Sequence, residues 1–463
     1  MSSKYMIHTT QVPHRFEPIT KSGVIAWEEG CLKCAVCVKK QCIYGVYEKR
    51  DLKSKQMIDS IDNQCMNCFR CVQNCPKELI HKSINPEFKA IGDTHWTPDI
   101  IARLWYQAET GKIPVSGAGY PGPFTGPGFD SMWTDMSEIV RPTRDGIHGR
   151  EYISTAMDLG GTPKFIQFNA EGRMVNDPEL IDIPIPIILR MPSFGAISEN
   201  TIRGWARAAS RLGTFLALPH KNISTELEEL HNCLIPIITP DDMPTQPYEN
   251  IRMVEVIWNE GFNKSIEQVR STYPRALISV RIPLKKGVEN QVIEILEAGC
   301  FVINLEGTFN GRTQDNESRF LKDGIMSVHN FLVSEGIRDE VTLLAGGGFA
   351  MAEHVAKSII CGADAVYADF PILIALECRM CHRCEQDLSC PVEIEKASSK
   401  WVGLRTLNII GAWHNQLLEV MGAMGIRDVR RLRGEVGRAM FYEDLDKDIF
   451  GKLGKVEEGF ELE

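Results

Sequence analysis

At 463 residues, the chain has room for two or three domains, one of them with a large hydrophobic core. Its 61 acidic against 51 basic residues leave a net charge of -10, which argues against a nucleic-acid binder, because such a protein needs a basic face. No apolar run has the length of a membrane span. Residues 1–15 lack the apolar core of a secretory signal, so we expect a cytoplasmic location.

Cysteine is the unusual feature of the composition. The chain has 15 cysteines, and because disulfides are rare in cytoplasmic proteins, metal ligation is the first interpretation of so many thiols. All but three of them fall into three tight groups of four. The three single cysteines lie in apolar stretches and are predicted to be packed core residues: Cys233, Cys300 and Cys361.

The first two groups predict a two-cluster ferredoxin module. The second reads Cys-x2-Cys-x2-Cys-x3-Cys-Pro, the run in which three cysteines surround one cubane and the fourth reaches the other cluster. Two zinc sites are the alternative, but structural zinc usually takes its cysteines in well-separated pairs. The first group departs from the pattern, with four residues before its last cysteine and Ile43 where proline is usual. The predicted ligand sets are Cys31, Cys34, Cys37 and Cys75 for one 4Fe–4S cluster, and Cys65, Cys68, Cys71 and Cys42 for the other.

The third group stands alone near the end of the chain. Its spacing is Cys-x2-Cys-x2-Cys-x5-Cys-Pro, and no second group is near enough in sequence to share a ligand. Four cysteines can complete a 4Fe–4S site, and losing one would leave a 3Fe–4S site; zinc is the alternative here too. The predicted ligands of this third iron–sulfur cluster are Cys378, Cys381, Cys384 and Cys390.

Along the chain, the expected order is the two-cluster module at residues 24–84, then a turn-rich wrapping segment at 85–163 with one helix at 99–109. Short apolar runs then alternate with amphipathic helices over 164–377, which predicts a (β/α)8 barrel, with an open doubly wound sheet as the alternative. The third iron–sulfur segment follows at 378–400 and a helical tail at 401–463. The expected strands are 185–189, 215–218, 234–238, 252–257, 276–282, 301–305, 341–345 and 365–367; the clearest helices are 199–212, 288–297, 323–334 and 350–361.

The tail carries an amphipathic stretch at 407–420, which we expect to pack on the barrel. Five arginines follow it, and either a solvated helix face or a binding surface would explain them. They are Arg427, Arg430, Arg431, Arg433 and Arg438.

A glycine run, Ala345-Gly346-Gly347-Gly348, ends the seventh expected strand. Phosphate is commonly held after strands seven and eight of such barrels, where glycines let backbone N–H groups approach its oxygens. FMN is the natural ligand, because a flavin connects one-electron clusters to two-electron chemistry.

Several motifs resemble the FMN-barrel (synthase) domain of the glutamate synthase family, in its archaeal-type arrangement with a ferredoxin module. Met191-Pro192-Ser193-Phe194-Gly195-Ala196-Ile197-Ser198 is close to the family's Met-Ser-Phe-Gly-Ala-Ile-Ser. The others are Ile278-Ser279-Val280-Arg281, the glycine run, and Leu373-Ile374-Ala375-Leu376-Glu377-Cys378. The resemblance implies an FMN site that includes Met191, Pro192, Ser193, Arg281, Gly346, Gly347 and Gly348. It also implies a third cluster of the 3Fe–4S type, which the fourth cysteine here shifts towards 4Fe–4S.

The departures from the family fall in the active site. Arg281 replaces the family's pocket lysine, and it cannot make the same compact ammonium contact. The segments 218–221 and 306–312 replace two of the family's glycine-rich loops. Asp369-Phe370 stands where the second phosphate corner usually reads Gly-Thr, and a carboxylate there repels phosphate unless a cation intervenes. No N-terminal nucleophilic cysteine of a glutaminase is present either.

Two hypotheses of function follow. In the first, the chain is an iron–sulfur, FMN-containing oxidoreductase of glutamate synthase type, which reduces 2-iminoglutarate to glutamate. In the second, it is an electron-relay subunit of a larger redox complex, with a catalytically altered barrel. Both imply other redox subunits as partners in a hetero-oligomer.

Overall fold

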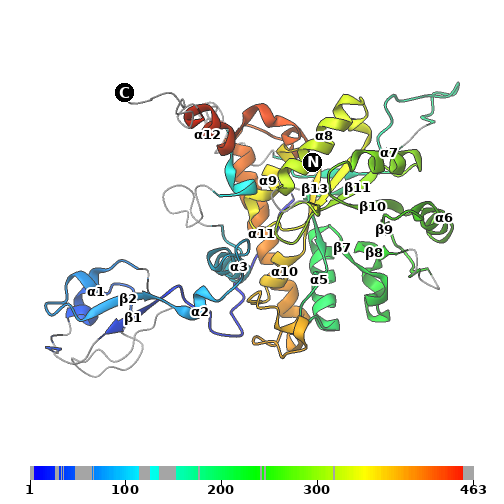
Figure 1. Cartoon of the computed structure of the whole chain (residues 1–463). Coiled ribbons are helices and arrows are strands. Elements are labelled where there is room, and N and C mark those ends of the chain that lie inside the picture. The colour runs from blue at the N-terminus through cyan, green and yellow to red at the C-terminus, as the bar shows by residue number, and fades with distance from the viewer. Residues whose placement is uncertain are drawn as a thin grey trace, which may run out of the picture. The chain divides into compact units, whose positions relative to one another are not determined.

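The structure is a computed structural model that divides into two compact units (Figure 1). The barrel unit comprises Met1–Val12, Leu104–Cys378 and His382–Glu463, and the cysteine unit comprises Pro13–Arg103 and Arg379–Cys381. The glycine- and proline-rich part of the expected wrapping segment, 114–125, lies outside the described residues. The described residues are 5–26, 31–32, 34, 36–46, 65, 67–113, 126–134, 153–175, 178–239, 242–243, 247–315 and 319–451.

The barrel unit is built on a closed barrel of eight parallel strands, in which β13 pairs with β6 to complete the ring. The (β/α)8 prediction is confirmed, and closure excludes the open sheet. Each strand lies within two residues of its predicted bounds, because short apolar runs covered on both faces are typical of parallel strands. The strands are β6 (Ile187–Arg190), β7 (Leu216–Pro219), β8 (Leu234–Ile238), β9 (Met253–Ile257), β10 (Leu277–Pro283), β11 (Val302–Glu306), β12 (Thr342–Gly346) and β13 (Ala365–Ala368).

Helices connect most of these strands. The clearest boundaries are those of α5, where the side chain of Ser198 accepts a hydrogen bond from the Thr201 amide at the start, and Gly213 adopts a left-handed conformation at the end. A 3-10 helix, η8 (Thr225–Cys233), stands between β7 and β8. The α-helices are α5 (Glu199–Leu212), α6 (Phe262–Thr272), α7 (Glu289–Glu297), α8 (Leu321–Ser334), α9 (Ala352–Ile360) and α10 (Phe370–Ile374).

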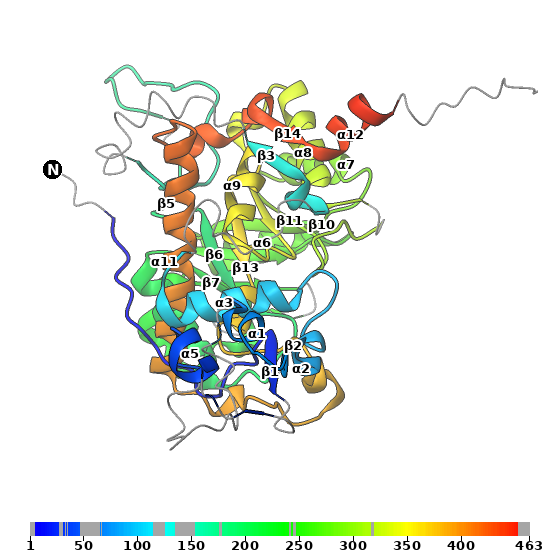
Figure 2. The ribbon, with the colours of Figure 1, turned by 90° about the vertical axis from the view of Figure 1, so that its left-hand side faces the viewer.

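The tail helix α11 (Ser399–Ala423) packs against α5 and α9, as its apolar stretch predicted; Figure 2 shows it as the long orange helix. Two glycines set how closely α11 and α5 approach. A Cβ on Gly204 would lie 2.6 Å from Cβ of Val402, and one on Gly403 would lie 3.1 Å from the Gly204 carbonyl oxygen. A larger residue at either position would therefore push the helices apart.

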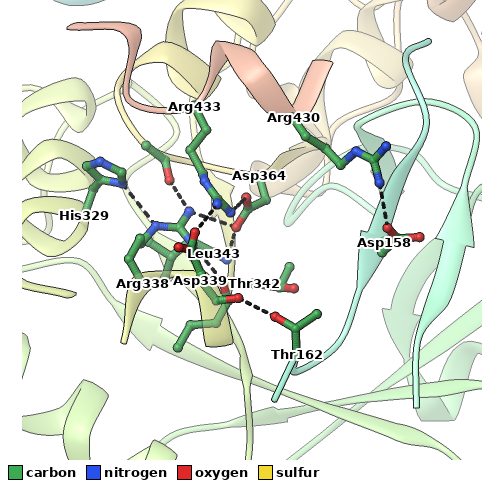
Figure 3. A network of polar contacts seen from close by, with 12 residues as sticks. Asp158, Thr162, His329, Arg338, Asp339, Thr342, Leu343, Asp364, Arg430 and Arg433 are labelled. Carbon is green, nitrogen blue, oxygen red and sulfur yellow. Dashed lines mark hydrogen bonds and ion pairs between the residues drawn. The ribbon is translucent and has the colours of Figure 1, made fainter. Parts of the chain in front are cut away.

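Two of the five arginines of the tail, Arg430 and Arg433, contact the rest of the barrel unit in the network drawn in Figure 3. Arg433 pairs with Asp364 at 2.9 Å and with Asp339 at 2.6 Å, and Asp364 also accepts from Arg338 at 2.9 Å. Arg430 pairs with Asp158 at 3.1 Å. Arg433 thus joins the tail to the barrel, which neither sequence interpretation expected, whereas the Arg430 side chain is 54% exposed, as a solvated face predicts.

The remaining short elements flank the barrel or form the cysteine unit. In the cysteine unit, β1 pairs with β2 in antiparallel register, Ser22 opposite Ile84 and Ala26 opposite Ile80. None of the helices among the described residues has the length and apolar character needed to cross a membrane. The elements are β1 (Ser22–Ala26), α1 (Arg70–Gln73), β2 (Ile80–Ile84), α2 (Pro86–Lys89), α3 (Pro98–Thr110), β3 (Met132–Thr134), β4 (Met157–Leu159), β5 (Ile181–Ile183), β14 (Ala439–Phe441) and α12 (Tyr442–Phe450).

Two buried histidines of the barrel unit predict a stability that depends on pH. Burial, with Arg338 and Arg433 nearby, lowers the pKa of His329 to about 4, and burial also lowers the pKa of His414 to about 4. The unfolded chain therefore takes up these protons first, at an ordinary histidine pKa of about 6.5. Stability should fall as the pH drops from about 6.5 towards 4.

We expect the unfolding temperature of the wild type to fall by several degrees between pH 6.5 and pH 5.5. His329→Gln and His414→Gln should each reduce that fall, and the double variant should reduce it most. Thermal unfolding followed by circular dichroism at several pH values tests this. An equal fall in the wild type and the double variant would rule out these histidines as its cause.

Candidate cofactor sites

The cysteine unit brings cysteines of the first two groups around one small apolar core. That core is formed by Val46, which is 2% exposed, and Ile80, which is 1% exposed. The side chains packed against it come from both groups. They are Cys37, Cys42, Cys65, Cys71, Val72 and Cys75.

The loop of the second group has a backbone suited to enclosing an anionic cluster. Asn67 and Phe69, between its first three cysteines, have φ of 56° and 58°. Left-handed residues of this kind turn successive N–H groups to one side of the chain, which forms an anion-binding concavity. Two donors already point at sulfur: the Leu79 amide donates to Cys75 Sγ at 3.4 Å and Lys82 Nζ donates to Cys65 Sγ at 2.8 Å. These features fit iron–sulfur ligation.

Among the residues that the structure describes, no three Cys, His, Asp or Glu side chains converge as ligands of one metal ion. The assignment of the twelve cysteines to clusters therefore stays a prediction.

The third group follows α10 and has the same backbone character. Cys378 is buried and Cys384 and Cys390 are half-buried in the barrel unit, whereas Cys381 belongs to the cysteine unit. Met380 and His382, between these cysteines, have φ of 51° and 53°.

An aromatic cluster joins the loop of the third group to the barrel. The ring of His382 lies 4.5 Å from that of Phe194, which follows β6, and Phe194 lies 4.9 Å from Phe370. Phe309 contacts both Phe370 and His382. Sequence reasoning missed this cluster, since its members are isolated in the chain.

At the carboxyl ends of the strands, the predicted flavin residues fall on the expected elements. Met191, Pro192 and Ser193 follow β6, and Pro192 is buried whereas Ser193 is exposed. Arg281 lies on β10 and is half-buried, and the glycine run closes β12 and is fully buried.

The barrel interior near Arg281 holds a buried hydrogen-bonded hub that sequence reasoning missed. At its centre is Glu255 of β9, which is 0% exposed. It forms an ion pair with Arg281 and accepts hydrogen bonds from Asn304 at 2.8 Å and from Tyr367 at 3.0 Å. Burial, followed by the charge of Glu255, raises the pKa of Tyr367 well above its ordinary value, so the phenol stays protonated. A single carboxylate in the apolar run Met253–Ile257 is the clue that sequence offered.

Beside this hub lies an ion cluster made of Arg190, Glu306 and Asp369. Arg190, the last residue of β6, pairs with both oxygens of Glu306 and with Asp369 at 2.8 Å. Burial acts to lower the pKa of Arg190, but Glu306 and Asp369 outweigh it and raise that pKa well above its ordinary value. Arg190 is thus the cation beside Asp369 that a carboxylate at this position needs.

FMN fits this corner poorly. The other oxygen of Asp369 accepts from the Phe370 amide at 2.7 Å, at the second position where a phosphate would be held. Other residues of the chain already fill the space beside the glycine run. A Cβ on Gly346 would overlap Glu306, and a Cβ on Gly348 would overlap Gly311.

Comparisons with known proteins place the chain among relatives of one kind. Residues 246–427 match the conserved region in glutamate synthase. The archaeal-type glutamate synthase [NADPH] of Dehalococcoides mccartyi is 26% identical, over 88% of this chain and 92% of that protein. Those of Archaeoglobus fulgidus and Thermotoga maritima are each 24% identical, over 92% and 91% of this chain and 96% and 95% of their own lengths. The resemblance to the glutamate synthase family is confirmed.

Among solved structures, a flavocytochrome b2 mutant with pyruvate bound is similar, at a TM-score of 0.41 and 13% identity. It covers 72% of this chain and 87% of that chain. This likeness is too weak to add to the strand order already described.

The hydrogen bond from Lys82 to Cys65 Sγ predicts an effect on reduction potential. A charged donor to a ligand sulfur stabilises the reduced cluster, by on the order of 1 kcal/mol. Lys82→Met should therefore lower the potential of the cluster assigned to Cys65 by tens of millivolts. Potentiometric titration followed by electron paramagnetic resonance (EPR) measures this. Lys89→Met, at an exposed lysine of the same unit, is the control, and an equal shift in both variants would contradict the assignment.

Proposed function

We propose that this chain, a relative of the archaeal-type glutamate synthases, is an iron–sulfur electron-transfer component of a glutamate-synthase-type oxidoreductase. The cysteine loops carry the proposal: left-handed residues lie between the cysteines, and two donors point at their sulfurs. The first two groups would hold two 4Fe–4S clusters, and the third group a further cluster. Such clusters supply one-electron transfer, at potentials set by hydrogen bonds to sulfur and by solvent exposure.

The residues around the third group hold its loop against the barrel mouth. His382 lies between two of its cysteines, and its ring lies 4.5 Å from that of Phe194 at a tilt of 40°, next to Phe370 at the barrel mouth. Nδ1 of His382 lies 2.6 Å from Glu385 Oε2, an interaction that holds the ring in place. Partner redox subunits, in a hetero-oligomer, would deliver and accept the electrons.

FMN-dependent glutamate formation by this chain's own barrel is the second candidate. Two observations favour it: the relatives match over nearly their whole length, and the glycine run ends β12 as the resemblance implies. The position of the Asp369 carboxylate where a flavin phosphate would bind argues against it.

Metal content tests the proposal directly. Protein purified without oxygen should contain roughly eight irons from the first two groups and about three or four from the third. Zinc in place of iron at the third group would contradict the third cluster.

Crossed ligation gives a sharper test. Cys75→Ser should damage the cluster held by Cys31, Cys34 and Cys37, and leave the cluster of its own sequence group intact. EPR spectra of the two reduced clusters distinguish them, with Cys233→Ser as the control, since that cysteine is buried in the barrel unit. Loss of the cluster assigned to Cys65 instead would show that each group holds its own cluster.

An assay of glutamate formation separates the two candidates. With 2-oxoglutarate, ammonia and reduced ferredoxin, an electron-transfer component alone should make no glutamate. It should still pass electrons from reduced ferredoxin to an artificial acceptor. Steady glutamate production by this chain alone would favour the second candidate.

A further inference from the structure

The ion cluster of Arg190, Glu306 and Asp369 lies where the strand order places a barrel's phosphate site. Its members come from the carboxyl ends of β6 and β11 and from the residue after β13. The glycine run ends β12, between β11 and β13 in the ring. Phosphate in such barrels is commonly held after the seventh and eighth strands, which are β12 and β13 here.

The guanidinium of Arg190 is fully used in contacts with Glu306, Asp369 and Tyr367. Its side chain is 6% exposed, and it contacts both carboxylates while its guanidinium lies 5.1 Å from the ring of Tyr367. A buried guanidinium cannot lose a carboxylate partner cheaply, because removing one charge of a buried pair is strongly destabilising. Arg190 is therefore unavailable to an incoming phosphate.

The Asp369 carboxylate makes the contacts at this corner that a bound phosphate would make. One of its oxygens pairs with Arg190, and the other accepts from the Phe370 amide. Its side chain is 6% exposed, so an outside anion cannot displace it without exposing or breaking the ion pair. The interactions that a bound phosphate makes, with a guanidinium and a backbone amide, are made here by a carboxylate of the chain.

The charge of the corner is also unfavourable for a second anion. Glu306, Asp369 and the nearby Glu255 are three carboxylates, against the two guanidiniums of Arg190 and Arg281. The net charge of these five side chains is therefore negative. Loop 307–311 adds a steric barrier, because its backbone covers Gly347 and Gly348.

We propose that the ion cluster of Arg190, Glu306 and Asp369 takes the place of a flavin phosphate, and that the barrel mouth of this chain binds no FMN. This goes beyond the electron-transfer function, which needs only the cysteine groups. The two can fail separately: clusters with bound FMN would overturn this proposal alone, and absent clusters would overturn the function alone.

The first test is the flavin content of full-length protein purified without oxygen and with its clusters in place. Acid-released flavin, measured by fluorescence, should be far below one per chain. About one FMN per chain would overturn the proposal.

The second test removes the anion. Asp369→Gly should bind added FMN at least about tenfold more tightly than the wild type, as measured by fluorescence quenching. Riboflavin, which lacks the phosphate, should show no such gain. Asp369→Asn keeps the side chain's size and removes only its charge, so it serves if the glycine variant does not fold.

Asp364→Gly is the matched control. Asp364 lies at the other end of β13, is also buried and is also paired with an arginine, Arg338 at 2.9 Å. Its loss should destabilise the same strand without changing FMN binding. If neither Asp369 variant gains affinity, or if Asp364→Gly gains as much, the ion cluster is not what excludes the flavin and the proposal is overturned.

Discussion

The structure of the barrel mouth depends on one ion cluster. The guanidinium of Arg190 is buried there, and it must stay paired with carboxylates. Arg190 ends an apolar strand and is buried, so its charge must be compensated within the protein. Glu306 and Asp369 do this, and in doing so they join the ends of β6, β11 and β13. The identity of the residue at 190 thereby determines which side chains fill the corner where such barrels bind phosphate.

Strand β13 is held by arginines at both of its ends. Asp364 immediately precedes it and pairs with Arg338 and Arg433, and Asp369 immediately follows it and pairs with Arg190. The first set attaches the tail to the barrel, and the second closes the barrel mouth. The two sets act at opposite ends of the strand, so we expect a change in one to leave the contacts of the other in place.

The sequence predicted the barrel well because its information is local. Apolar runs such as 234–238, separated by turns and amphipathic helices, indicate buried parallel strands without any knowledge of their partners. The charge pairs carry no such local pattern, since Arg190 is 116 residues from Glu306 and 179 from Asp369. The role of Asp369 could not be predicted without the spatial position of Arg190, and neither could the pairing of the two side chains.

The prediction of clusters is also local, because it rests on the spacing of the cysteines within each group. The altered mouth distinguishes this chain's barrel from the FMN barrel that the resemblance implies. A crystal structure of the full-length protein, grown without oxygen from cluster-containing material soaked in FMN, tests the central claim most directly. Our account predicts the Asp369 carboxylate on Arg190 and on the Phe370 amide, with no flavin at the mouth. A phosphate bound to the amides of Gly347 and Gly348, with Asp369 turned away, would contradict it.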